Sequence, residues 1–147
     1  MKFYFKSLVG ILILFYLFAC SPEPKPIDFG NDNCHFCDMT IMDNKHAAEL
    51  VTAKRKVFKF DAIECMLQNI ARTDQQEYAY KLISDYSNPG ELINAQQSVY
   101  LISKKLPSPM GAFLSGFSSE GAAKSAQEEN GGILYNWDQI KAKINSN

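Results

Sequence analysis

The N-terminal segment limits what this chain can fold into, because its first nineteen residues have the pattern of an export signal. Lys2 and Lys6 precede an apolar run of twelve residues that extends from Leu8 to Ala19. That run is too short for a membrane span, which needs roughly 20 apolar residues, and it is typical of a secretory signal peptide. With residues 1–19 removed, 128 of the 147 residues remain for one compact domain or two small ones.

Cys20 follows this run in a context that resembles the lipobox of bacterial lipoproteins, with Leu17 three positions before it and Ala19 directly before it. We therefore expect acylation of Cys20, for example by palmitate, and a protein anchored by lipid at the periplasmic face of the outer membrane. Three prolines alternate in residues 21–26, so residues 20–32 are expected to form an extended tether. The alternative is an ordinary signal peptide cut elsewhere, with Cys20 incidental.

The charge of the remaining chain argues against a nucleic-acid partner. Loss of residues 1–19 removes two lysines and leaves 13 basic against 16 acidic residues, a net charge of −3. A nucleic-acid-binding domain needs a basic face, so we expect no such partner.

The mature sequence divides into two units with the same order of elements. In the first unit, residues 33–88, a hairpin is followed by an amphipathic helix, a third strand and a turn. The predicted elements are strands 46–52 and 57–60, helix 61–71, strand 78–86 and a turn over 87–91. Asp61 and Glu64 have the spacing of a capping box, which predicts Asp61 as the N-cap of the helix.

The second unit, residues 89–147, repeats this order and adds a C-terminal helix. Its predicted elements are strands 99–103 and 111–117, a helix from Ser118 or Ser119 to about Glu129, strand 133–137 and a helix capped by Asp138. Gly131 and Gly132 are expected to stop the first of these helices. The predicted fold class is α+β, with two small ββαβ units in tandem after the signal peptide and the Pro-rich tether.

Three sulfur donors lie within six residues, in the motif Cys34-His35-Phe36-Cys37-Asp38-Met39. Thiolates and thioethers select soft metals, Cu(I) above all, and Zn(II) where thiolates dominate. A zinc ribbon needs a second cysteine pair, and a hard ion such as Mg²⁺ or Ca²⁺ needs clustered carboxylates, which this segment lacks. Copper is therefore the metal that these donors fit best.

Two other uses of Cys34 and Cys37 remain open from the spacing alone. A disulfide between them would be natural in an oxidising compartment and would only close a turn. A redox-active pair would make the protein a thiol oxidoreductase, although that motif usually follows a strand and opens a helix. Within the motif, only His35 could lower the pKa of a thiol.

Further residues are candidates for additional metal ligands. Cys65 lies on the predicted helix 61–71, off its main apolar stripe, where a lone cysteine is more often a small buried side chain. His35 lies within the motif, and Met42 and His46 follow it closely, but imidazoles are more often hydrogen-bonded than metal-bound. Met110 stands in a Pro-Met-Gly loop of the second unit, from which a thioether could close a site opened by the first.

Taken together, these features resemble the nitrous oxide reductase accessory lipoprotein (NosL) family. The similarity consists of an acylated N-terminus, the C-x-x-C-x-M motif, a hairpin that ends in Phe60-Asp61 before a helix, and three stretches of the second half. Those stretches are Ser108-Pro109-Met110-Gly111, Phe117-Ser118 and Glu129 to Leu134. At Asp38 the chain departs from the family, which usually has glycine there.

The resemblance implies a membrane-tethered Cu(I) chaperone, not an enzyme, that helps to assemble the copper-sulfide centre of nitrous oxide reductase in denitrification. It implies Cys34, Cys37, Met39 and Met110 as the copper-binding positions, and nitrous oxide reductase or its copper-site assembly factors as partners. Thioethers bind Cu(I) more weakly than thiolates do, so such a site can release its metal by stepwise ligand exchange. A different client for the metal is the alternative.

Overall fold

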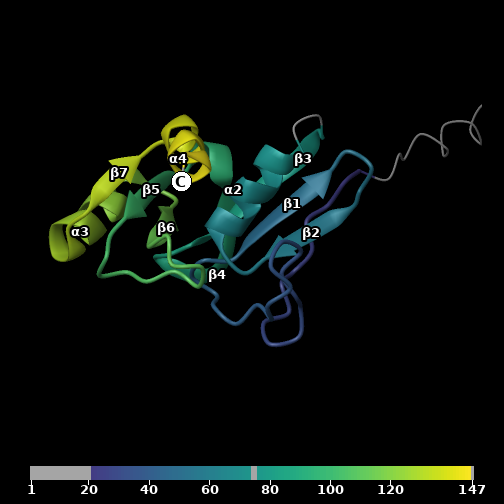
Figure 1. The fold of residues 1–147 in the computed structure, drawn as a ribbon, viewed down its shortest axis with the longest axis horizontal. Coiled ribbons are helices and arrows are strands. Elements are labelled where there is room, and N and C mark those ends of the chain that lie inside the picture. Colours follow the sequence, from purple (N-terminus) through teal and green to yellow (C-terminus); the bar gives the residue numbers. More distant parts are fainter. Residues whose placement is uncertain (1–20, 74–75, 147) are drawn as a thin grey trace, which may run out of the picture.

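The computed structural model describes residues 21–73 and 76–146 (Figure 1). The predicted signal peptide, residues 1–19, and the predicted lipidation site, Cys20, lie outside the described residues. Within the described part of the chain, no helix is both long and apolar enough to cross a membrane.

The first unit is an antiparallel sheet with one helix packed against it. In chain order, its elements are β1 (Ala48–Thr52), β2 (Val57–Phe60), α2 (Ile63–Arg72), β3 (Tyr78–Asp85) and β4 (Asn88–Asn94). The strand order is β2-β1-β3-β4, and every neighbouring pair is antiparallel. β1 is buried along its whole length because it lies inside the sheet, α2 packs against it, and the segment at Lys25 reaches the side chain of Glu49.

The second unit repeats the order of strands and helix in a three-stranded sheet. A 3₁₀ turn (Ala95–Gln97) leads into β5 (Val99–Ile102), β6 (Leu114–Phe117), α3 (Glu120–Asn130), β7 (Ile133–Tyr135) and α4 (Trp137–Asn145). The order β6-β5-β7 matches the β2-β1-β3 part of the first sheet, because the first strand of each unit is central. The predicted α+β fold with two ββαβ units in tandem is confirmed.

The end of the first unit differs from the prediction. The turn after β3 occupies residues 86–87, and residues 88–94 form a strand, β4, where a turn and a boundary at 88/89 were expected. The carboxylate of Asp85 tightens this turn by accepting a hydrogen bond from the backbone N–H of Ser87. Since β4 pairs with β3, the chain passes to the second sheet only after β4 ends.

The start of α2 also corrects the prediction, because Asp61 is not its N-cap. The cap is Ala62, whose side chain makes no capping hydrogen bond. Asp61 is buried beneath the segment that carries the sulfur motif, where the backbone N–H of Met42 donates a hydrogen bond to it. Tertiary contacts therefore use the carboxylate that the local spacing assigned to a cap.

The two helices of the second unit follow local capping rules closely. Ser119 caps α3 by accepting a hydrogen bond from the backbone N–H of Ala122, and Gly131 ends the helix with a positive φ of 68°, as predicted. α4 is capped by Asn136 and not by Asp138. Asn136 and Gln139 form a complete capping box, so the cap lies two residues earlier than expected.

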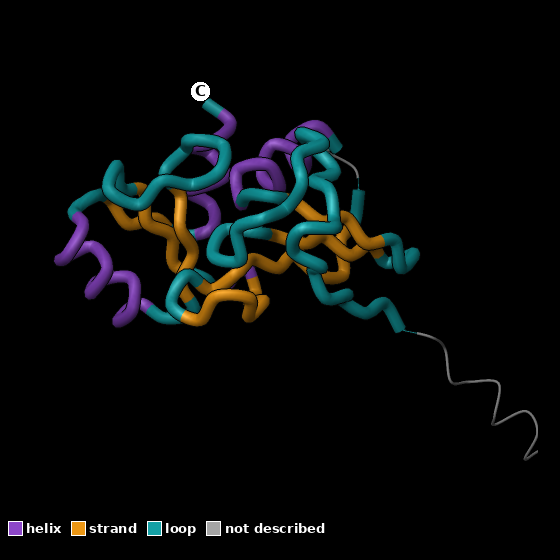
Figure 2. The backbone as a smooth tube through the Cα atoms, turned by 90° about the horizontal axis from the view of Figure 1, so that it is seen from below, coloured by secondary structure: helices purple, strands orange, loops and turns teal. Residues whose placement is uncertain are grey.

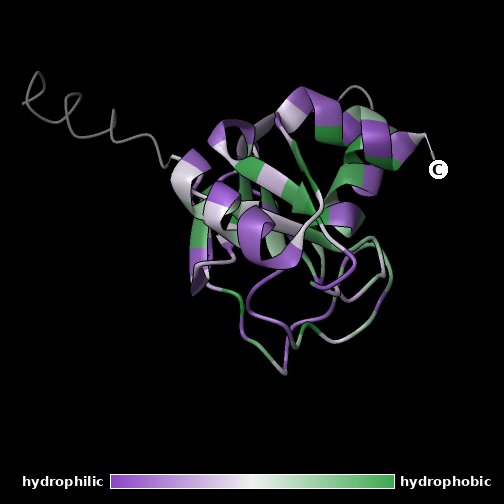
Figure 3. Cartoon of the chain, turned by 90° about the vertical axis from the view of Figure 1, so that its left-hand side faces the viewer, coloured by the Kyte–Doolittle hydropathy of each residue, from purple (hydrophilic) through white to green (hydrophobic). Residues whose placement is uncertain are grey.

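Among the described residues, the larger of two hydrophobic clusters contains buried residues of both units, and the smaller one lies in the second unit. β3 packs against β6, and α2 packs against α4. The approach is tight at Gly116 in β6, where a Cβ atom would lie 2.3 Å from Cδ1 of Ile83 in β3. Figures 1 and 2 show α3 at one end of the long axis and the β1–β2 hairpin toward the other, and Figure 3 shows apolar residues along the strands.

Part of the predicted tether belongs to the folded domain. The backbone N–H of Lys25 donates a 2.9 Å hydrogen bond to the buried carboxylate of Glu49 in β1. Ile27 and Phe29 are partly buried against the core. Of the tether expected over residues 20–32, the described residues from Lys25 onward are therefore held on the first unit.

Candidate metal centre

The sulfur motif forms a tight turn that brings its two cysteines to one side. The backbone N–H of Cys34 donates to the carbonyl of Met39 (2.8 Å), and the N–H of Asp38 donates to the carbonyl of Cys34 (2.9 Å). Asp38 has a φ of 61°, in the left-handed region that glycine adopts most readily. The backbone thus takes a glycine-like conformation at the position where the resembled family usually has glycine.

Neighbouring elements fix this turn against the first unit. The N–H of His35 donates to the carbonyl of Lys59 at the end of β2 (2.8 Å), and its ring packs on Phe58 with centroids 4.4 Å apart. On the other side, the guanidinium of Arg72 in α2 lies 4.4 Å from the centre of the Phe36 ring. The turn is therefore held across both the sheet and α2.

Cys65, in the first turn of α2, completes a cluster of three thiols. The Sγ atoms of Cys34, Cys37 and Cys65 all lie within 4.8 Å of one another, and those of Cys37 and Cys65 are 3.9 Å apart. All three are free thiols; Cys34 and Cys65 are buried, and Cys37 is half-buried. Three sulfur atoms that surround one metal at about 2.3 Å lie about 4 Å from one another, so the spacing fits a single soft ion.

The three thiols are electrostatically unequal. The pKa of Cys34 is lowered to about 5, mainly by a hydrogen bond from Cys65 and also by backbone N–H groups such as that of Asp61, which together outweigh burial. Burial raises the pKa of Cys37. The pKa of Cys65 is raised because its proton is held in the hydrogen bond to Cys34 and because the thiol is buried. Near neutral pH the cluster therefore holds one thiolate and two thiols.

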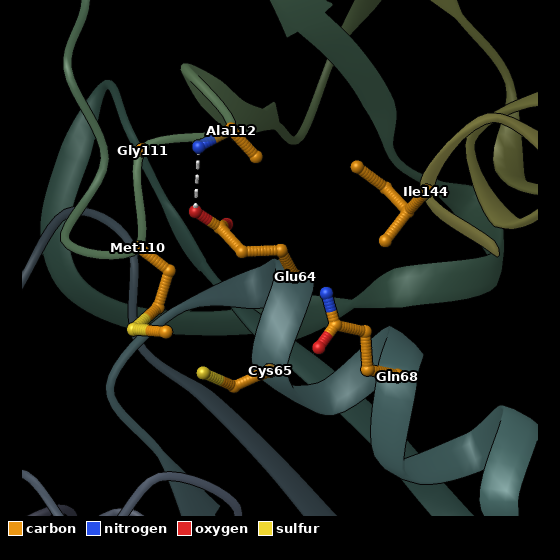
Figure 4. A pocket seen from close by; sticks show the side chains of 7 residues that line it. All are labelled: Glu64, Cys65, Gln68, Met110, Gly111, Ala112 and Ile144. Atoms are coloured by element: carbon orange, nitrogen blue, oxygen red, sulfur yellow. Dashed lines mark hydrogen bonds between the residues drawn. The ribbon is translucent and has the colours of Figure 1, made fainter. Parts of the chain in front are cut away.

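Met110, from the loop between β5 and β6, faces this helix from the second unit. Met110 and Cys65 line one pocket of about 160 Å³ together with Glu64, Gln68 and three apolar or glycine positions. Figure 4 shows both sulfur atoms on the same side of this pocket. The structure therefore brings the predicted thioether of the second unit close to the cysteine cluster of the first.

The remaining predicted ligands lie at the edge of the cluster or away from it. Met39 and Met42 are exposed residues, at 50% and 70% of their areas. His46 is buried elsewhere, and its ring nitrogens bond to Asp43 Oδ2 (2.8 Å) and Ser115 Oγ (3.3 Å). These contacts occupy both nitrogens of His46 with protein partners.

Two contributions are larger in the structure than the sequence indicates. Cys65 is only a candidate for an additional ligand in the sequence, where a lone helix cysteine is more often a small buried side chain; it is buried, at 1% exposure, but its Sγ also joins the cluster. The first turn of α2 is buried on all sides, since the sheet, the sulfur motif and the Met110 loop each cover one of its faces. From its sequence spacing, Glu64 is expected only to take part in a capping box, whereas the structure places it in the pocket with Met110 and Cys65.

Comparisons with known proteins agree with this architecture. The family model described as NosL matches residues 26–145. Among solved structures, the crystal structure of the copper chaperone NosL from Shewanella denitrificans is similar, with a TM-score of 0.70 and 23% sequence identity. That match covers 82% of this chain and 96% of the other, and it shows a common fold. No curated protein matches the chain.

Proposed function

Because the chain belongs to the NosL family, whose model matches residues 26–145, we propose that it is a Cu(I)-binding chaperone. The observation that carries the proposal is the cluster of Cys34, Cys37 and Cys65, whose sulfur atoms lie within 4.8 Å of one another. The solved structure that shares the fold is described as a copper chaperone, which supports the same assignment.

The donor set favours Cu(I) over other metals. Thiolate and thioether sulfur bind Cu(I) strongly, whereas Mg²⁺ and Ca²⁺ take oxygen ligands. The cluster also suits a carrier, because Cys37 is half-buried and the thioethers of Met39 and Met110 reach the surface nearby. Weak thioether ligands at the rim can take the metal as stronger thiolates release it, so the ion can pass to a partner stepwise.

A competition titration tests copper binding directly. Reduced protein is titrated anaerobically with Cu(I) in the presence of a chromogenic Cu(I) ligand such as bicinchoninate. We expect one tightly bound Cu(I) per chain, and weaker binding in Cys37→Ser and in Met39→Leu. Met66→Leu is the matched control, because Met66 is fully buried in the core and its replacement conserves volume. Unchanged affinity in both Cys37→Ser and Met39→Leu would contradict the proposal.

The alternative class is a thiol–disulfide redox lipoprotein that uses Cys34 and Cys37. Native mass spectrometry separates the two, since a chaperone gains the mass of one copper after anaerobic loading. A mass deficit of about two hydrogens that persists in mild reductant would indicate a disulfide instead. The three free thiols of the structure are compatible with the copper site that we propose.

We further propose that the copper is delivered for assembly of the copper-sulfide centre of nitrous oxide reductase. Family membership supports this client, and the exposed thioethers supply a surface for hand-over. The test mixes the copper-loaded protein with metal-free nitrous oxide reductase and its copper-site assembly factors. Copper that moves to these partners, but not to an unrelated copper enzyme, supports the client. Equal transfer to both would contradict it.

The proposal includes a lipid anchor on Cys20 at the periplasmic face of the outer membrane. Its support is the lipobox-like sequence Leu17 to Cys20. We expect the wild-type protein to partition into the detergent phase and its N-terminal peptide to carry acyl chains. Cys20→Ser should move the protein to the aqueous phase while Cu(I) binding is retained. Detergent-phase partition of Cys20→Ser would refute the anchor without touching the copper site.

A further inference from the structure

Glu64 is a buried carboxylate that capping does not explain. It lies in the first turn of α2, directly before Cys65, and is 2% exposed. Figure 4 shows its side chain pointing away from the helix and into the pocket that Met110 and Cys65 line. A carboxyl group is rarely buried unless it has a structural or functional role, because removing it from water costs free energy.

One oxygen of Glu64 binds the loop that carries Met110 from both sides. Oε1 accepts a hydrogen bond from the hydroxyl of Ser108 and a second, at 3.4 Å, from the backbone N–H of Ala112. The other oxygen, Oε2, is buried and has no hydrogen-bond partner among the described residues. Both hydrogen bonds to Glu64 therefore come from the Met110 loop: Ser108 lies two positions before Met110, and Ala112 lies two positions after it.

Hydrogen bonds within the second unit set the shape of the Met110 loop, and Ala112 packs against the core. Gly111 and Phe113 both have positive φ angles, of 77° and 59°, and the N–H of Gly111 donates to the carbonyl of Ser108 to close a turn around Met110. That turn sets the local shape of the loop but not its position relative to α2. The position depends on contacts to the helix, of which those of Glu64 are polar and directional.

We propose that Glu64 is a positioning residue that holds the Met110 loop against α2, so that the Met110 thioether faces Cys65 and the cysteine cluster. This inference rests on the proposed Cu(I) site. A thioether contributes most to affinity when its sulfur is already held close to the metal site, because ordering a free methionine on binding costs side-chain entropy. Glu64, next to Cys65, holds the Met110 loop in place before the metal binds.

The test is a double-mutant cycle on the full-length mature protein, read by anaerobic Cu(I) competition titration. We expect Glu64→Ala to weaken Cu(I) binding about tenfold, the size typical for residues that orient a metal ligand. In the Met110→Leu background the same change should have no further effect. Glu64→Gln should stay within about twofold of the wild type, since it keeps an acceptor oxygen for Ser108 and Ala112. Gln68→Ala, which alters the same pocket but removes neither of the two hydrogen bonds from Glu64 to the loop, is the matched control.

A second readout needs no metal. Hydrogen exchange of the backbone of residues 108–113 in metal-free protein should accelerate in Glu64→Ala and stay unchanged in Glu64→Gln. If Glu64→Ala does not fold, Ser108→Ala breaks the same contact from the loop side and should give the same coupling to Met110.

Four results would overturn the inference. They are an equal loss in Glu64→Ala with and without Met110, a loss in Glu64→Gln as large as in Glu64→Ala, no effect of Met110→Leu on affinity, and unchanged loop exchange in Glu64→Ala. A wild-type protein that binds no Cu(I) would instead refute the proposed function.

Discussion

The sulfur atoms of Cys37 and Cys65 lie 3.9 Å apart although 28 residues separate them in the chain. The contact joins the turn of the sulfur motif to the first turn of α2, and the hairpin of β1 and β2 lies between them in sequence. A metal bound here would connect the N-terminal turn to the core helix, so Cys65 should matter as much as the motif cysteines.

We predict that Cys65→Ser lowers the affinity for Cu(I) by more than about 100-fold. Loss of a ligand should exceed the 10- to 100-fold cost that is typical for a residue that only supports a ligand. Anaerobic competition titration measures the affinity, and thermal unfolding of the metal-free variant checks that it is folded. Met66→Leu, one position further along α2, should leave the affinity unchanged. An effect of Cys65→Ser below about tenfold would show that Cys65 only packs.

We predict that binding of Cu(I) to the cluster displaces two protons near neutral pH. The low pKa of Cys34, about 5, leaves it as a thiolate there, whereas the raised pKa values of Cys37 and Cys65 keep both protonated. The apparent affinity should therefore fall about 100-fold for each pH unit of acidification between about pH 6 and 8. Competition titrations at several pH values measure this slope. In Cys37→Ser, which keeps the hydrogen bond from Cys65 to Cys34, the slope should be about tenfold per unit, and an unchanged slope would exclude Cys37 as a ligand.

The parts of the site that could be predicted from the sequence are those in which residues close together in the chain meet within one turn. Two cysteines three positions apart can meet within one turn, and the turn from Cys34 to Met39 needs only its own backbone hydrogen bonds. Cys65 reaches the cluster only through the packing of α2 against that turn, which no local pattern encodes. The same holds for Glu64, whose partners are in the second unit.

The fold shows the same division between local and non-local information. Ser119 caps α3 as predicted, because nothing competes for its exposed hydroxyl. Asp61 has an equally good capping pattern, but the fold buries it. The repeated order of elements predicted two matching units, yet the strand after the turn at residues 86–87 joins the first sheet because β3 offers it an unpaired edge.

We predict a pH-dependent contribution to stability from the link between Asp85 and Ser118. Burial acts to raise the pKa of Asp85, but the hydroxyl of Ser118 (2.7 Å) and further donors outweigh burial and lower it below 3.8. A lowered folded-state pKa means that the stabilisation is present above about pH 4 and is lost as the pH falls through the folded pKa.

Ser118→Ala should therefore lower the free energy of unfolding by about 1–3 kcal/mol at pH 7, and by less at about pH 3. Urea unfolding at both pH values measures the difference. Ser125→Ala, at an exposed position inside α3, should change stability little at either pH. A penalty for Ser118→Ala that is equal at both pH values would mean that the Asp85 charge does not contribute.

We predict that Gly116→Ala destabilises the protein by about 1–3 kcal/mol, as overpacking of a core does. A Cβ atom at Gly116 would lie 2.3 Å from Cδ1 of Ile83, at the contact between the two units. Ile83→Val removes that methyl group, so the double variant should lose less than the sum of the single losses. Gly121→Ala is the control, because it lies in α3 with open space around it and should stabilise the helix. Urea unfolding reports all four variants, and a neutral Gly116→Ala would show that the two sheets can separate at this contact without cost.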